Sequence, residues 1–178
     1  MFRIKTVAVA VAVMLGNLVL VQAPAGATHV RCFDLSVPHD SEHLGTENQD
    51  YLDGDGGNDV MHGRGNPNVE PDYLMGFGGD DKMCGGDNYD VMWGGAGHDR
   101  MSGGHYDDTI QGDSGNDTIK GGGRNDDLFG EDGADQLWDG FGADWLSGGD
   151  GTDTAYICNN DETERYINDI ENIYYITC

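Results

Sequence analysis

The sequence predicts an all-β fold in which short strands stack along one axis as a solenoid. A nine-residue unit occurs twelve times in register between Gly45 and Tyr156. Each unit joins a glycine-rich turn, G-x-x-G-x-D, to a three-residue segment with one central apolar residue. A segment this short cannot bury its own apolar residue, so a core forms only when successive strands stack.

The eighth position of each unit supplies this predicted core. If successive units alternate between two sides of the solenoid, the eighth residues form two columns. The first column is Leu52, Leu74, Met92, Ile110, Leu128 and Leu146, and the second is Met61, Met83, Met101, Ile119, Leu137 and Ala155. Four methionines suggest a soft filling.

The sixth position of every unit is an aspartate. The twelve residues are Asp50, Asp59, Asp72, Asp81, Asp90, Asp99, Asp108, Asp117, Asp126, Asp135, Asp144 and Asp153. Only the third unit is longer, by an insertion at 67–70. Glycine at the turn positions permits positive φ or close approach of a second backbone.

Such turns point backbone carbonyls inward beside the carboxylate, and this set of hard oxygen ligands suits calcium. Calcium takes six to eight oxygens at about 2.3–2.6 Å, more than one turn can supply. Two stacked turns are therefore expected to share each ion.

The repeated unit resembles the G-G-x-G-x-D-x-U-x nonapeptide of the repeats-in-toxin (RTX, haemolysin-type calcium-binding) family. The resemblance covers about two thirds of the chain, residues 45–156. It implies a parallel β-roll in which units alternate between two parallel sheets, with neighbours in one sheet eighteen residues apart. Six layers are expected, with short strand caps at residues 28–44 and 157–178.

The fourth turn position divides the units into two sets, which define two edges of the roll. It is glycine in every even-numbered unit, whereas the odd-numbered units carry Asn48, Asn66, Asn88, Tyr106 and Arg124, with Gly142 as the exception. Tyrosine and arginine adopt the left-handed region poorly. We expect a regular ladder of about five Ca²⁺ ions on the even edge and fewer or weaker ions on the odd edge, unless the odd turns adjust locally and still bind.

The predicted calcium ligands follow from this division. The even-edge ligands are Asp59, Asp81, Asp99, Asp117, Asp135 and Asp153, and the odd-edge ligands are Asp90, Asp108, Asp126 and Asp144.

The N-terminal 27 residues are typical of a signal peptide, with Arg3 and Lys5 before an apolar run and a small-residue cleavage site at 25–27. Removing them leaves 7 basic against 33 acidic residues, a net charge of −26. This charge repels nucleic acids and anionic membrane faces and attracts cations. The sequence therefore predicts a secreted, extracellular protein with no membrane span and no nucleic-acid partner.

Four cysteines in an exported chain indicate disulfides, with three connectivities open. Spacing favours Cys158–Cys178 and Cys32–Cys84. Residues 29–37 alternate as an edge strand, and the C-terminal segment also predicts a strand cap. The sequence His39-Asp40-Ser41-Glu42-His43 matches a zinc-peptidase motif, H-x-x-E-H, but lacks room for the helix and cleft that such a site requires.

Few residues lie outside the array, and no catalytic constellation accompanies it. We therefore expect a non-catalytic, secreted protein that folds on calcium into a β-roll for a structural or interaction role, with an extracellular protein or polysaccharide as partner. The alternative is an accessory or remnant of an RTX-type secreted enzyme (metallopeptidase or lipase) or toxin.

Overall fold

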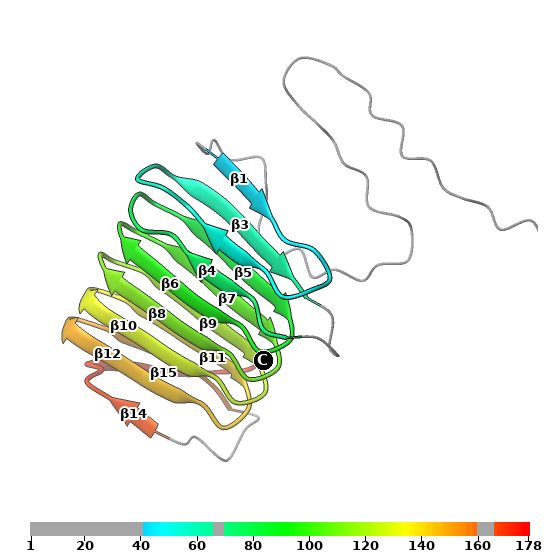
Figure 1. Ribbon diagram of the computed structural model, residues 1–178. Helices are drawn as coiled ribbons and strands as arrows, with labels where there is room; N and C mark the ends of the chain where they lie inside the picture. Colours follow the sequence, from blue (N-terminus) through cyan, green and yellow to red (C-terminus); the bar gives the residue numbers. More distant parts are fainter. Residues whose placement is uncertain (1–40, 66–69, 160–165) are drawn as a thin grey trace, which may run out of the picture.

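The computed structural model describes residues 41–65, 70–159 and 166–178, and these build a solenoid of parallel strands (Figure 1). The predicted signal peptide and the predicted strand at 29–37 lie outside the described residues. No helix long and apolar enough to span a bilayer occurs within the described ranges.

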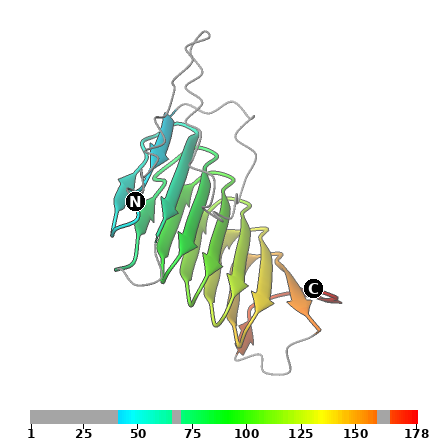
Figure 2. The same ribbon diagram turned by 90° about the vertical axis from the view of Figure 1, so that its right-hand side faces the viewer.

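Two parallel sheets face each other along the solenoid (Figure 2). The eight-stranded sheet has the order β1 (Ser41–Leu44), β3 (Asp59–Arg64), β5 (Lys82–Asp87), β7 (Arg100–His105), β9 (Thr118–Gly123), β11 (Gln136–Phe141), β13 (Thr154–Cys158) and β15 (Asn172–Ile176). The seven-stranded sheet has the order β14 (Tyr166–Asn168), β12 (Trp145–Gly151), β10 (Asp127–Gly133), β8 (Thr109–Ser114), β6 (Val91–Ala96), β4 (Tyr73–Met75) and β2 (Tyr51–Asp53).

The strand register confirms the eighteen-residue period. Thr109 on β8 pairs with Asp127 on β10, and Asp127 pairs with Trp145 on β12. Across the inserted residues the step lengthens to twenty-two, because Tyr51 pairs with Tyr73. The register of the sheet therefore continues across the insertion.

The core is the double column predicted from the eighth positions. Every member from Met61 to Ala155 is fully buried, and Leu52 at the N-terminal end is partly buried. The four core methionines, Met61, Met83, Met92 and Met101, are completely excluded from solvent.

Strands cap both ends, as predicted, and they continue the register of the roll. Ser41 on β1 pairs with Asp59, which places His43 opposite the core residue Met61. At the other end Ile173 on β15 pairs with Ala155. The C-terminal segment therefore forms one more coil than the six layers expected, and no separate cap lies beyond it among the described residues.

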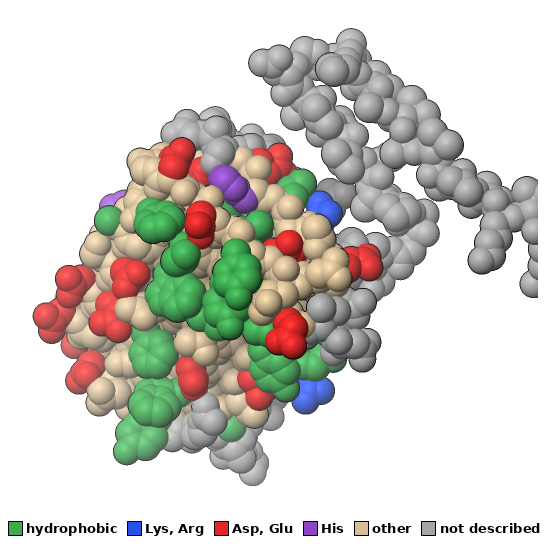
Figure 3. Space-filling model, viewed as in Figure 1, with side chains coloured by type: hydrophobic (Ala, Val, Ile, Leu, Met, Phe, Trp, Pro, Cys, Tyr) green, Lys and Arg blue, Asp and Glu red, His purple; other side chains and the backbone are tan. Residues whose placement is uncertain are grey.

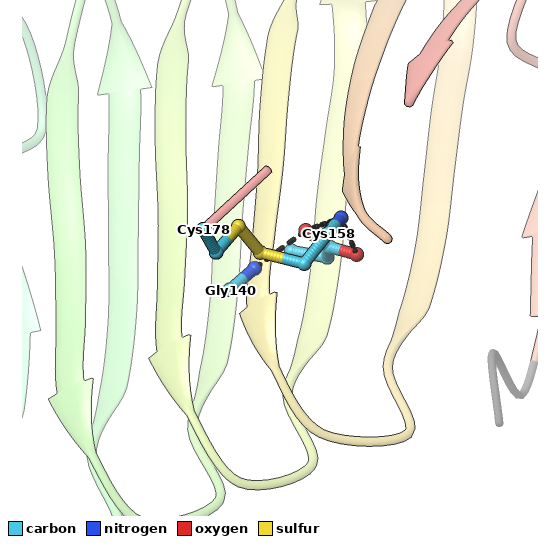
Figure 4. The surroundings of a disulfide bond; sticks show 4 residues. Gly140, Cys158 and Cys178 are labelled. Atoms are coloured by element: carbon cyan, nitrogen blue, oxygen red, sulfur yellow. Dashed lines mark hydrogen bonds between the residues drawn. A yellow bond between two sulfur atoms is a disulfide. The ribbon is translucent and has the colours of Figure 1, made fainter. Parts of the chain in front are cut away.

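A disulfide joins Cys158 on β13 to Cys178, the pairing favoured by their spacing, with a Cα–Cα distance of 5.6 Å (Figure 4). Cys84 is also disulfide-bonded. The expected partner of Cys84, Cys32, lies outside the described residues.

Candidate metal centre

Each turn delivers its sixth-position aspartate to the inside of the roll. From Asp59 to Asp153 these side chains are at most 2% exposed. Burial of so many carboxyl groups is costly unless their oxygens are bonded or neutralised. The hydrogen-bond partners of each carboxylate oxygen therefore show whether the turns can bind an ion.

One oxygen of each interior carboxylate, Oδ1, accepts a hydrogen bond from a backbone N–H of the preceding coil. The backbone N–H of Asp99 donates to Oδ1 of Asp117 at 2.7 Å, and the N–H of Asp117 donates to Oδ1 of Asp135 at 2.7 Å. The odd edge repeats the pattern, with the N–H of Asp90 donating to Oδ1 of Asp108 at 2.8 Å. At the C-terminal end Glu171 replaces the aspartate, and its Oε2 accepts the N–H of Asp153 at 2.7 Å.

The second oxygen, Oδ2, is buried and has no hydrogen-bond partner in ten of these aspartates. They are Asp72, Asp81, Asp90, Asp99, Asp108, Asp117, Asp126, Asp135, Asp144 and Asp153. A buried acceptor without a donor calls for an explanation such as a bound ion. Oδ2 lacks a donor at every interior coil, as expected for an atom that binds an ion shared between two coils.

The N-terminal coil differs from this pattern. Oδ2 of the predicted ligand Asp59 accepts the N–H of Asp55 at 2.8 Å, and Oδ2 of Asp50 accepts the N–H of Thr46 at 2.6 Å. Asp72, which the predicted ligand set did not include, has the same free oxygen as the interior residues. The insertion at 67–70 lies within the turn of Asp72, but the spacing from Asp72 to the core residue Leu74 is that of the other units, and this spacing is the signal that Asp72 keeps its place.

At interior turns the free Oδ2 and a backbone carbonyl of the next coil both lie beside the first-position glycine. A Cβ placed on Gly94 would lie 2.4 Å from Oδ2 of Asp99 and 2.7 Å from the carbonyl oxygen of Gly112. The distances at Gly112 itself are the same, to Asp117 and to the carbonyl of Gly130. The first turn position is glycine because any side chain would fill the space where these oxygens converge.

This donor set fits calcium. It consists of carboxylate and carbonyl oxygens only, and it is contributed by adjacent coils. No group of three His, Cys, Asp or Glu side chains forms a metal site within the described residues. One carboxylate per turn explains that result, because carbonyls from two turns would supply the remaining ligands.

The electrostatics are consistent with a bound cation. On the even edge, burial raises the pKa of the carboxyl groups of Asp81 and Asp117 to about 7 and of Asp99 and Asp135 to about 6. The bond from the neighbouring backbone N–H lowers each pKa, whereas charges on nearby aspartates raise all four.

On the odd edge the shifts are larger. Burial raises the pKa of Asp90 and Asp126 to about 8 and that of Asp108 to about 10. Without a cation these carboxyl groups favour the protonated form near neutral pH, and a bound divalent ion reverses that preference.

The odd turns keep the left-handed backbone despite their larger residues. Asn88, Tyr106 and Arg124 have φ of 107°, 83° and 88°, compared with 152° for Gly97 and 138° for Gly115 on the even edge. The aspartate ladder also runs through them unbroken. The structure thus shows local adjustment of the odd turns; their calcium occupancy stays a prediction.

The even turns have left-handed non-glycine residues of their own, at the second position, which the prediction did not weigh. Phe77, Asp113 and Glu131 have φ of 69°, 69° and 74°. The odd turns are mixed at this position, because Gly104 is glycine whereas Arg64 is left-handed with φ of 83°. The second position therefore does not divide the two edges as the fourth position does.

Side chains from successive odd turns stack over that edge. The Arg124 guanidinium lies 5.0 Å from the centre of the Tyr106 ring, and the Tyr106 and Tyr89 rings are 5.9 Å apart. The stack lies on the same edge as Asp90, Asp108 and Asp126, whose carboxyl groups have the higher pKa values.

The last odd turn begins with an aspartate in place of glycine. Asp139 is 1% exposed, and both of its carboxylate oxygens lie 3.0 Å from the backbone N–H of Cys158 (Figure 4). Its Oδ1 also accepts the N–H of Gly140 at 2.6 Å. The turn that contains the predicted ligand Asp144 therefore begins with a buried, hydrogen-bonded carboxylate, whereas every other turn of the array begins with glycine.

The H-x-x-E-H match does not form a zinc site of the expected kind. Glu42 and His43 lie on strand β1, whereas the motif requires a helix. His43 instead approaches Asp59, with 4.0 Å between Nε2 and Oδ1.

Stacked parallel coils with oxygen-lined glycine turns define a calcium-binding β-roll. The chain belongs to the family of the RTX calcium-binding nonapeptide repeat (4 copies), whose model matches residues 44–69, 70–92, 75–104, 93–128 and 120–155. These matches together span the array from residue 44 to residue 155. No curated protein and no solved structure matches the chain.

Proposed function

We propose that this protein is a secreted, non-catalytic calcium-binding protein whose roll orders when it meets extracellular Ca²⁺. The observation that carries the proposal is the repeated buried Oδ2, which lacks a donor at ten turns and faces a carbonyl of the next coil at interior turns. A calcium ion supplies the positive charge and the coordination that these oxygens lack.

The even edge is the main ion ladder in this proposal. Its six turns enclose five positions between adjacent coils, and the interior residues Asp81, Asp99, Asp117 and Asp135 share one geometry. The odd edge offers similar oxygens from Asp72 to Asp126, but the carboxyl groups of Asp90, Asp108 and Asp126 are harder to ionise because their pKa values are higher.

Charge explains why the ion would control folding. The chain has 33 acidic and 9 basic residues, a net charge of −24. On the face shown in Figure 3, acidic side chains lie around a central group of hydrophobic ones, and few Lys or Arg are visible. Repulsion among the carboxylates opposes the compact state, and the core holds only one apolar residue per unit.

The role of the folded roll is structural or adhesive, with an extracellular protein or polysaccharide as partner. The N-terminal signal sequence supports export, and extracellular modules bind calcium with dissociation constants of about 10⁻⁴–10⁻³ M. Sharing of ions between coils makes binding cooperative.

The test is a calcium titration of the mature chain followed by far-ultraviolet circular dichroism, with disulfides intact. We expect little β-structure in chelator and a cooperative rise with Ca²⁺, and a much weaker response to Mg²⁺, which demands tighter octahedral geometry. A spectrum that chelator leaves unchanged would refute calcium-driven folding.

A further inference from the structure

A polar groove lies on the outer side of the even edge, and the ion-ladder residues Asp81 and Asp99 are part of its lining. Its volume is about 330 Å³, and it crosses strands β5, β7 and β9. The side chains that matter here are Asp80, Lys82, His98, Arg100, Asn116 and Thr118. Every residue that lines the groove is polar or charged.

The fifth turn positions form a hydrogen-bonded ladder along this groove. Oδ1 of Asp80 accepts the N–H of His98 at 2.9 Å, and Nδ1 of His98 accepts the N–H of Asn116 at 2.9 Å. Oδ1 of Asn116 accepts the N–H of Ala134 at 2.8 Å. Because Nδ1 of His98 is an acceptor, a neutral imidazole carries its proton on Nε2.

The ladder uses the acceptor atoms of His98 and Asn116, so the side-chain N–H donors of these two residues remain available. No hydrogen bond from Nε2 of His98 or from the amide nitrogen of Asn116 occurs within the described residues, and both side chains are exposed to solvent. A ligand in the groove therefore meets N–H groups that need an acceptor.

Two cations complete the site. Lys82 on β5 and Arg100 on β7 are paired neighbours in the sheet. Neither makes an ion pair within the described part of the chain, although Asp81 and Asp99 flank them, because those carboxylates point into the roll. Two adjacent cations without a bonded carboxylate are unusual in a chain with 33 acidic residues.

We propose that this groove binds a hydroxylated monocarboxylate, a sugar acid either free or at the end of a glycan. Lys82 and Arg100 hold the carboxylate, since charge-assisted bonds to guanidinium and ammonium are the strong ones. His98 and Asn116 donate to ring or hydroxyl oxygens, and the remaining oxygen of Asp80 and the Thr118 hydroxyl accept from hydroxyl groups.

The composition of the groove selects this ligand class. A peptide would bring apolar side chains to a groove with no apolar lining. A long polyanion would meet the net charge of −24, whereas a single carboxylate at one cationic pair avoids most of that repulsion.

The experiment uses the full mature chain saturated with Ca²⁺ and isothermal titration with three probes: sodium glucuronate, glucose, and an oligosaccharide with one terminal glucuronate. We expect both acidic probes to bind and glucose to bind at least about tenfold more weakly, as loss of a charge-assisted contact predicts. Binding of the oligosaccharide alone would place the site on a glycan end, within the proposal. No binding of either acidic probe, or equal binding of glucose, would overturn it.

Matched variants separate this site from calcium binding. Lys82→Gln is expected to weaken glucuronate binding about tenfold. Lys120→Gln is the matched control, because it makes the same charge change on the same sheet. The Lys120 ammonium lies 5.5 Å from the Trp138 ring and outside the groove. This variant should change the affinity for glucuronate by less than about twofold. Equal losses in the two variants would show non-specific attraction and refute the site. Circular dichroism with and without Ca²⁺ on each variant reports folding independently, so failure of calcium-driven folding and failure of sugar-acid binding give different results.

Discussion

The two edges of the roll have the same hydrogen-bonded aspartate ladder but different surroundings for it. On the even edge the fourth turn position is glycine, and the interior carboxyl groups have pKa values of about 6–7. On the odd edge Tyr106 and Arg124 stack over the turns, and the pKa values rise to about 8–10. The difference teaches that turns with the same hydrogen-bonded ladder can hold carboxyl groups of different pKa, because burial and the charges of neighbouring aspartates differ between the edges.

The largest effect expected from this difference concerns pH in calcium-free protein. A carboxyl group whose folded pKa is raised above the ordinary value of 3.8 stabilises the fold fully below that value, and this contribution is lost as pH rises through the folded pKa. The even edge loses it near pH 6–7 and the odd edge near pH 8–10. Circular dichroism in chelator should show more β-structure at pH 5 than at pH 9, and a signal independent of pH would contradict the burial of these groups.

A second prediction concerns the C-terminal end of the odd edge, where the disulfide holds the N–H of Cys158 against Asp139. Replacing Cys158 and Cys178 by serine removes a cross-link over 20 residues, worth about 3 kcal/mol by chain entropy. The calcium-bound melting temperature should fall while calcium-induced β-structure remains. Hydrogen exchange should accelerate in the odd turn at 139–144 more than in the even turn at 148–153; the opposite order would show that the disulfide does not support the odd edge.

The third prediction compares Asp117→Asn with Asp108→Asn. Each amide keeps Oδ1 to accept the N–H of the neighbouring coil and changes only the free oxygen. Asp117, with a pKa of about 7, ionises more readily than Asp108, with a pKa of about 10, so its loss should raise the calcium midpoint by about tenfold. The shift for Asp108→Asn should be clearly smaller in the same titration. Equal shifts would make the two edges equivalent for calcium.

The smallest effect isolates charge from backbone strain. Arg124→Gly and Phe77→Gly each remove a left-handed non-glycine residue, one from each edge, and such strain costs about 1–3 kcal/mol. Only Arg124→Gly also removes a charge, a positive one near the ion column, so it should lower the calcium midpoint by about threefold relative to Phe77→Gly. Equal midpoints in parallel titrations would assign the whole effect to strain.

The period, both core columns and the inward aspartates were predictable because each depends on spacing alone. The C-terminal coil was harder to place, because Tyr166 follows its partner Trp145 by twenty-one residues and Glu171 replaces the aspartate. The strand register identifies these residues even though the nonapeptide motif does not. His43 at a core position could not be predicted either, since it depends on the pairing of β1 with β3.

The roles of Asp139 and of the stack on Tyr106 depend on contacts between residues that only the folded chain brings together. Asp139 departs from the repeat in the sequence, yet its partner is a backbone N–H nineteen residues away. Arg124 and Tyr106 were expected to disturb the odd turns, because propensity alone favours glycine there. Their ring and guanidinium contact, which no single-residue preference reports, accompanies the local adjustment that was the alternative.

The hydrogen bonds between aspartates give the roll a chemical polarity. Every N–H in the ladder donates to a carboxylate that lies later in the chain, and on the even edge the series ends at Glu171, which accepts from Asp153. Each interior aspartate therefore needs two neighbours, because the preceding coil donates to its Oδ1 and the following coil accepts from its N–H. Dividing the roll between two coils would leave backbone donors at the cut end of the N-terminal part and carboxylate acceptors at the cut end of the C-terminal part.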